Sequence, residues 1–145
     1  MKSHDNKLKK ELISRGLLKE SHLQKVNDEI LKTKCSVRQA VLKLGFLTEQ
    51  DVLTVEADIL SVSFLDLDKY LFINEAIVKM VPESVARAHH VMPVFKIGKL
   101  TVATSDASDI LALDEVRDAV GEDIDIVLST REMIERAIEQ YYGGV

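Results

Sequence analysis

Few side chains in this sequence have the types and spacing that catalysis or metal binding requires. His89 and His90 are adjacent, and neighbours on a helix point about 100° apart, so the pair does not favour chelation of one ion. Cys35 is the single cysteine and has no histidine near it in the sequence, which excludes an internal disulfide and disfavours a catalytic thiol. Gly98 and Lys99 lack the upstream glycine and the following hydroxyl of a phosphate-binding Gly-x4-Gly-Lys-Ser/Thr loop. We therefore expect no metal, no cofactor, no catalytic residues and no ATP hydrolysis by this chain.

Four carboxylates lie close together in the sequence, at Asp106, Asp109, Asp114 and Glu115. Two of them could meet around a cation, because hard cations take carboxylate oxygens. A polar turn that caps a helix, followed by a solvated helix face, explains the same residues without an ion. The second interpretation needs no further ligand, and we expect no metal site here.

Charge is distributed unevenly along the 145 residues. Residues 1–65 carry 11 Lys and Arg and 9 Asp and Glu, net +2, whereas residues 66–145 carry 8 and 15, net −7. The acidic half and the absence of tryptophan disfavour a nucleic-acid partner. The basic half is consistent with an acidic protein partner, with an anionic ligand, or with a solvated helix surface. No apolar run approaches the roughly 20 residues of a membrane helix, and no signal peptide is present, so we expect a cytoplasmic location without membrane insertion.

The second half of the sequence predicts a small sheet flanked by helices. Met92–Lys96 and Leu100–Thr104 alternate as strands around Gly98, which supplies the positive φ of a tight hairpin turn. Ile124–Leu128 is a third strand candidate, and helical patterns at 74–80, 82–90, 110–120 and 130–142 surround these segments. We expect residues 63–145 to form an α+β sandwich with a mostly antiparallel three-stranded sheet.

The first half repeats one helical pattern. Helices are expected at 7–15, from a cap at Ser21 through 31, at 37–44 and at 49–59, with Ser36 and Thr48 as further caps. Gly16 and Gly45 end the first and third helices and lie 29 residues apart (45 − 16). A repeat of helical pairs at this period predicts two stacked hairpins that share one core. We expect residues 1–62 to form a four-helix cluster.

The repeat resembles the tandem motif Arg-Leu-Gly-x-x-Leu-Val-x-x-Gly-x6-Leu-x3-Leu-x2-Gln. This motif is typical of the N-terminal domains of type II secretion and type IV pilus assembly ATPases, the GspE/PilB/MshE group. Later stretches at 64–67, 81–86, 91–94, 98–103, 106–109 and 134–142 are also similar to that domain, so the resemblance covers nearly the whole chain. It implies a non-catalytic docking or regulatory module for a membrane-anchored platform protein with a GspL-like cytoplasmic domain. Some members of the group bind cyclic di-GMP through the tandem motif.

Both copies of the motif depart from the family pattern. Lys9 and Arg38 replace the first glycines, and Asn27 and Glu56 replace the second leucines. Ile30 and Ile59 replace the glutamines, and Ser36 replaces the second arginine. A cyclic dinucleotide needs cations for its guanines and phosphates, and glycines where backbone amides approach it. If it binds, the resemblance assigns its site to Lys7, Leu8, Leu12, Gly16, Leu23, Val37, Arg38, Val41, Gly45 and Val52.

The positions that build helix packing are kept, whereas those that suit a ligand are mostly replaced. We therefore expect protein docking to be the main function and cyclic di-GMP binding to be the alternative. The candidate docking face is the first helix, with Lys7, Leu8, Leu12 and Ile13. Docking on an inner-membrane partner implies a location peripheral to that membrane, held through the partner.

Overall fold

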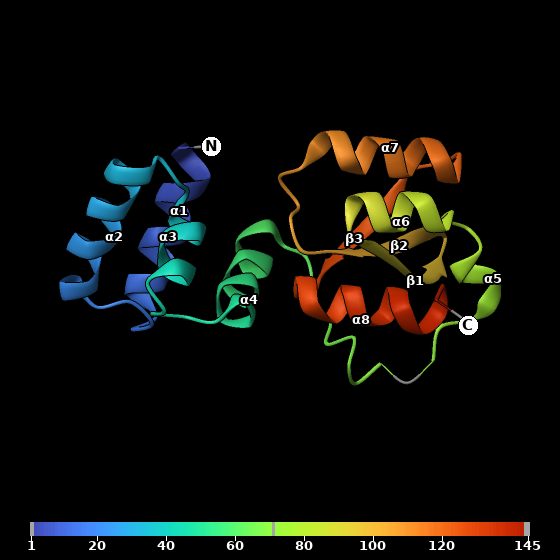
Figure 1. Ribbon diagram of the computed structural model, residues 1–145, viewed down its shortest axis with the longest axis horizontal. Coiled ribbons are helices and arrows are strands. Elements are labelled where there is room, and N and C mark those ends of the chain that lie inside the picture. The colour runs from blue at the N-terminus through green and yellow to red at the C-terminus, as the bar shows by residue number, and fades with distance from the viewer. Residues whose placement is uncertain (1, 71, 144–145) are drawn as a thin grey trace. The chain divides into compact units, whose positions relative to one another are not determined.

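The computed structural model describes residues 2–70 and 72–143 and divides into two compact units. Unit 1 spans residues 1–61 and unit 2 spans residues 62–145, so the division lies one residue before the boundary expected from the sequence. Each unit has its own hydrophobic core. Figure 1 shows unit 1 as helices only and unit 2 as a sheet with helices around it.

Unit 1 contains α1 (Lys2–Ser14), α2 (Glu20–Thr33), α3 (Val37–Lys43) and α4 (Glu49–Leu60). The hydroxyls of Ser36 and Thr48 accept hydrogen bonds from the backbone N–H groups three residues later, so both predicted caps are confirmed. The predicted cap at Ser21 is wrong. Lys19 is the N-cap of α2, because the His22 ring accepts a hydrogen bond from the Lys19 N–H and so stabilises an earlier helix start.

The helices of the two motif copies interleave. α1 packs on α3 and α4, and α2 packs on α3, so each helix pairs mainly with a helix of the other copy. The reason lies in the first helix of each copy, where Leu8, Leu12, Val37 and Val41 are all fully buried. The copies play equivalent parts in one core, but they are not two separate hairpins stacked on each other.

Unit 2 is built on a mixed sheet of β1 (Val91–Ile97), β2 (Lys99–Thr104) and β3 (Ile124–Leu128), in the order β1-β2-β3. β1 and β2 form the predicted hairpin, with Gly98 at φ +74°. β2 and β3 are parallel, so the expectation of a mostly antiparallel sheet does not hold for β3. Helix α7 (Ile110–Val120) makes the crossover that returns the chain in the same direction. The α+β class predicted from the sequence is confirmed.

The remaining helices of unit 2 are α5 (Glu75–Val78), α6 (Glu83–His89) and α8 (Arg131–Tyr141). α5, α6 and α8 pack on β1, α8 also packs on β2, and α7 packs on α6 (Figure 1). The hydroxyl of Thr130 accepts a hydrogen bond from the Met133 N–H, which confirms the predicted start of the last helix. Over residues 2–70 and 72–143, the structure has no helix that is both long enough and apolar enough to span a membrane.

Candidate functional site

The motif positions that the chain retains form the interior of unit 1. Leu8, Leu12, Val41 and Val52 have an exposed fraction of 0% and Val37 of 1%, whereas Leu23 is only half-buried. These side chains therefore hold the helices together through apolar burial. They lie beneath any surface that a ligand could reach.

The two motif glycines end α1 and α3 with the same geometry. Gly16 and Gly45 have φ of +73° and +74°, in the left-handed region that glycine enters without a Cβ penalty. In each copy the next residue donates a backbone hydrogen bond five residues back, from Leu17 N to Leu12 O and from Phe46 N to Val41 O. A Cβ at either glycine would meet no atom within 4 Å, so the requirement is the backbone conformation itself.

The replaced motif positions pair with each other. In the first copy the Lys9 ammonium donates a hydrogen bond to Asn27 Oδ1 at 2.9 Å. In the second copy, at positions 29 residues further on, Arg38 Nε lies 3.7 Å from Glu56 Oε1. A cation thus stands at each first glycine position, and its partner at each second leucine position is a hydrogen-bond acceptor in the first copy and an ion-pair carboxylate in the second. The chain places its own polar side chains together at the positions where the motif otherwise has glycine and leucine.

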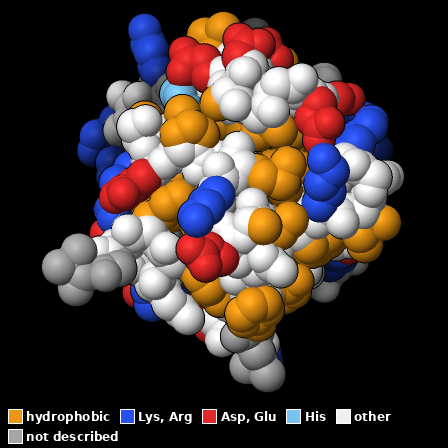
Figure 2. Space-filling view, turned by 90° about the vertical axis from the view of Figure 1, so that its right-hand side faces the viewer, with side chains coloured by type: hydrophobic (Ala, Val, Ile, Leu, Met, Phe, Trp, Pro, Cys, Tyr) orange, Lys and Arg blue, Asp and Glu red, His pale blue; other side chains and the backbone are white. Residues whose placement is uncertain are grey.

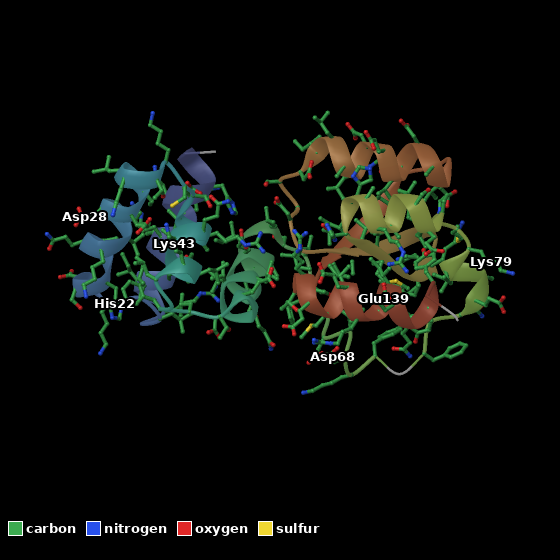
Figure 3. The ribbon with its side chains drawn as sticks, viewed as in Figure 1. His22, Asp28, Lys43, Asp68, Lys79 and Glu139 are labelled. Atoms are coloured by element: carbon green, nitrogen blue, oxygen red, sulfur yellow. The ribbon has the colours of Figure 1, made fainter. Side chains whose placement is uncertain are left out.

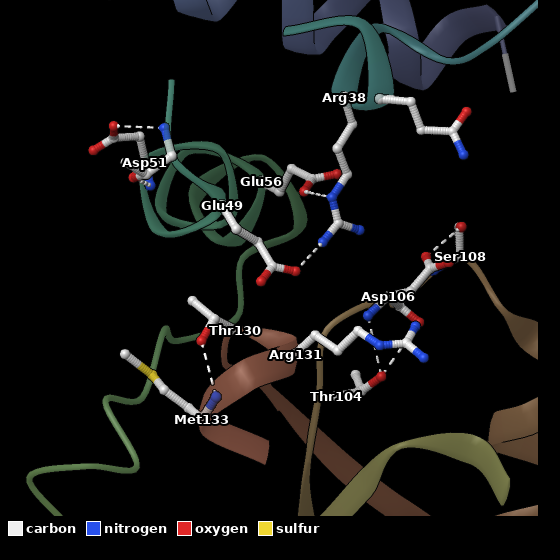
Figure 4. Close-up of polar contacts among 12 residues, drawn as sticks. Arg38, Glu49, Asp51, Glu56, Thr104, Asp106, Ser108, Thr130, Arg131 and Met133 are labelled. Atoms are coloured by element: carbon white, nitrogen blue, oxygen red, sulfur yellow. Dashed lines mark hydrogen bonds and ion pairs between the residues drawn. The ribbon is translucent and has the colours of Figure 1, made fainter. Parts of the chain in front are cut away.

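The pair in the second copy belongs to a larger cluster, of which Figure 4 labels Arg38, Glu49 and Glu56. Arg38 Nη2 donates to Glu49 Oε2 at 3.1 Å, and His4 Nε2 lies 2.9 Å from Glu56 Oε2. The Glu56 side chain is only 10% exposed. Its Oε1 atom is buried and makes no hydrogen bond to any residue that the structure describes. The cluster therefore contains a buried carboxylate that is only partly compensated, which is costly unless Arg38 stays beside it.

Two cross-copy ion pairs show the equivalence of the copies at the surface of unit 1. Arg15, directly after α1, pairs with Asp58 in α4 at 2.8 Å, and Lys43 in α3 pairs with Glu29 in α2 at 3.0 Å. Asp58 and Glu29 occupy positions 29 residues apart (58 − 29). The Lys43 ammonium lowers the pKa of the Glu29 carboxyl through a hydrogen bond, although burial opposes this shift.

The expected docking face on the first helix is not a surface. Leu8 and Leu12 are fully buried, Ile13 is half-buried, and Lys7 alone among the four is exposed. The apolar stripe of α1 faces α3 and α4, because an amphipathic helix turns its apolar side towards the core. A partner could reach Leu8 or Leu12 only by opening the helical cluster.

The other chemical candidates make separate local contacts. His89 Nε2 pairs with Glu115, and His90 ends α6 at φ +51°, with Arg131 Nη2 at 2.8 Å from its Nε2 atom. Asp106 accepts hydrogen bonds from Ser108 in a local turn (Figure 4). Across the described part of the chain, no three His, Cys, Asp or Glu residues are grouped so as to hold a metal ion.

The sequence already contained the signal for the polar pairs. Asn27 follows Lys9 by 18 residues (27 − 9), and Glu56 follows Arg38 by the same 18 (56 − 38). Considered one at a time, these departures from the motif look like independent losses. The signal is that the same two motif positions are replaced in both copies, each time by a cation and a polar side chain that can pair with it. His4 and Glu49 carry no such signal, because the motif does not include them.

Comparisons with known proteins agree with this architecture. A family model described as the MshEN domain matches residues 60–145. The type IV pilus assembly ATPase PilB of Myxococcus xanthus (strain DK1622) is 31% identical over 136 residues, which cover 91% of this chain and 23% of PilB. The chain thus spans about a quarter of that relative's length.

Two solved structures share the fold. The structure of MshE with cdg has a TM-score of 0.81 and 23% identity, and the match covers 93% of this chain and 98% of that chain. The N-terminal domain of XpsE has a TM-score of 0.74 and 24% identity, with coverage of 97% and 96%. The family model, which spans more than half of the residues, identifies the chain as a member of the MshEN domain family.

Proposed function

We propose that this chain is a non-catalytic docking and regulatory module of a type II secretion or type IV pilus ATPase. Its partner is the cytoplasmic domain of a membrane-anchored platform protein, similar to GspL. One observation carries the proposal: both motif copies keep their core positions and fill the replaced positions with Lys9–Asn27 and Arg38–Glu56. A motif that serves only as a scaffold leaves the outer surface of the domain for protein contacts.

Two observations support a non-catalytic role. The sequence has no Gly-x4-Gly-Lys-Ser/Thr loop to hold nucleotide phosphates and magnesium. The match to PilB covers only 23% of that ATPase. Hydrolysis therefore belongs to the remainder of such proteins, and the module acts through binding.

An apolar band on unit 2 is the surface that suits docking. We define the apolar band as Phe72, Ile77, Met80 and Ile97. Phe72 and Ile97 are 70% and 80% exposed, while Ile77 and Met80 pack partly against the core. α5 packs on β1, and Figure 2 shows apolar side chains gathered across this face of the molecule. Exposed apolar side chains that gather on one face commonly mark a binding site.

Charged residues near the apolar band are paired within the chain. Lys79 pairs with Glu75 at 3.1 Å, and Lys96 with Glu122 at 2.8 Å. Such local pairing leaves little net charge, so a partner gains mainly by covering the apolar side chains. An apolar centre with a polar rim is the usual anatomy of a protein interface.

Calorimetric titration with the platform protein's cytoplasmic domain tests docking. We expect Phe72→Asp and Ile97→Asp each to weaken binding at least about tenfold, because each removes about 1.5–3 kcal/mol of apolar burial. Leu31→Glu is the matched control, since Leu31 is 79% exposed but lies in unit 1. Absence of binding by the unmodified chain contradicts the docking function, whereas equal binding by all variants contradicts only the apolar band.

Cyclic di-GMP binding is the alternative, and the fold match to the structure of MshE with cdg favours it. Lys7 is exposed and forms no ion pair with a described residue, so it remains available to a phosphate. Arg38 is 19% exposed and engaged by two carboxylates, so a ligand must displace them. Titration of the chain with cyclic di-GMP tests this alternative. If the chain binds cyclic di-GMP with micromolar affinity and Arg38→Ala abolishes that binding, a receptor function is favoured over docking.

A further inference from the structure

The outer face of α7 combines exposed apolar side chains with acidic ones. Ile110 and Leu111 are 65% and 78% exposed at the start of the helix. Asp114 and Asp118 follow Leu111 at spacings of three and seven residues, which places all three on one side of the helix. The opposite side of α7 buries Leu113 in the core of unit 2. The exposed side is defined here as the acidic face: Ile110, Leu111, Asp114, Glu115 and Asp118.

The outer face of α2 combines an exposed apolar side chain with basic ones. α2 packs on α3 and buries Val26. On its other side Leu31 is 79% exposed, and Lys25 and Lys32 are exposed as well. Figure 3 shows Asp28 pointing away from the helices of unit 1. The side around Leu31 is defined here as the basic face: Lys25, Asp28, Leu31, Lys32 and Lys34.

The two faces have opposite charge. The basic face carries three lysines and one carboxylate. The acidic face carries three carboxylates, of which Asp114 pairs with Arg117 and Glu115 with His89, whereas Asp118 is unpaired among the described residues. Lys25, Lys34 and Asp118 make no ion pair with any residue in the described ranges. These charges are therefore free to pair across a contact, unlike the paired charges near the apolar band. Complementary charges around apolar centres favour association and fix its orientation.

We propose that the basic face of one copy of this chain docks on the acidic face of a second copy. Leu31 packs against Ile110 and Leu111, and the lysines of α2 lie near Asp114 and Asp118. The contact joins two different patches, one from unit 1 of the first copy and one from unit 2 of the second. One helix pair makes a small interface, so association is expected only at high micromolar concentration.

Sedimentation velocity of the full chain tests the proposal. Over about two decades of concentration we expect the mass at low salt to rise above the 16.3 kDa monomer. It should fall back when salt is raised from about 0.05 M to about 0.5 M, because salt screens exposed charges. Leu31→Glu and Leu111→Glu should each remain monomeric. Both positions are exposed, so circular dichroism should show an unchanged fold.

A mixture of the two variants gives the decisive result. Leu31→Glu retains an intact acidic face and Leu111→Glu an intact basic face, so together they should form a one-to-one dimer that cannot extend. Ile97→Asp should associate like the unmodified chain, because Ile97 belongs to neither face. An unmodified chain that stays monomeric, or a variant mixture that does not dimerise, overturns the proposal. Docking through the apolar band uses other residues and is tested by a separate experiment.

Discussion

Replacing Arg38 and replacing Glu56 should change the stability of unit 1 in opposite directions. Arg38→Ala leaves the Glu56 carboxylate buried with only His4 beside it, at 2.9 Å. Loss of one partner of a buried ion pair costs about 3–5 kcal/mol. The Nε–Oε1 distance is already 3.7 Å and Oε1 makes no hydrogen bond, so we expect a smaller loss of about 2 kcal/mol.

Glu56→Leu removes the buried charge and supplies an apolar side chain in a core position. Arg38 keeps Glu49 at 3.1 Å and is 19% exposed, so it does not become an isolated buried charge. Replacing buried ions by apolar residues is commonly neutral or stabilising, and we expect a change between 0 and about 1 kcal/mol in favour of folding. The double variant Arg38→Ala/Glu56→Leu should recover most of the loss caused by Arg38→Ala.

Urea denaturation followed by circular dichroism measures these free energies of unfolding. Because the chain has two units, hydrogen exchange of the α3 and α4 amides should report on unit 1 separately. The first-copy pair provides the control, since Lys9→Ala breaks a bond to a neutral amide and should cost at most about 1 kcal/mol. The reasoning is refuted if Glu56→Leu destabilises unit 1 more than Arg38→Ala does.

Three further outcomes are expected. Gly45→Ala should cost about 1–2 kcal/mol in urea denaturation, because a Cβ is strained at φ +74°, and Gly45→Asn should cost less; equal losses would contradict this reason. A hydrogen bond from Arg136 lowers the pKa of the Asp68 carboxyl in the folded state, so the unfolded state takes up this proton at a higher pH than the folded state does. The free energy of unfolding should therefore decrease as the pH falls below about 4. Denaturation midpoints in low salt measure this, and an unchanged acid slope in Arg136→Gln would contradict it. Burial raises the pKa of the Tyr142 phenol, whose single O–H lies within hydrogen-bonding distance of two backbone carbonyls. The folded state therefore keeps this proton longer, and stability should decline as pH rises past about 10, a decline that Tyr142→Phe should remove.

Local signals in the sequence predicted the parts of the fold that local chemistry determines. Ser36, Thr48 and Thr130 mark helix starts because their hydroxyls replace missing partners of the first N–H groups. Gly98 marks the hairpin because of its positive φ. The direction of β3 was not predictable in this way, since a parallel pairing depends on the path of the whole α7 crossover.

The sequence predicted which motif positions correspond between the two copies, but not which of them are buried or which side chains pair. The repeat identified Leu12 and Val41 as equivalent, and both are in the core. The helical period of Leu8 and Leu12 could not tell whether this stripe faces a partner or the domain's own interior, because either arrangement gives the same pattern. The pairing of Arg38 with Glu56 depends on the crossing of α3 and α4, which periodicity does not describe.

The interleaving of α1–α4 has a consequence for how the two motif copies can change. Since α1 packs on α4 and α2 on α3, neither half of the repeat encloses an interior by itself, and unit 1 should melt as one cooperative body. A substitution in one half alters the environment of the other. The doubled sequence therefore builds a single structural unit in which neither half is independent of the other.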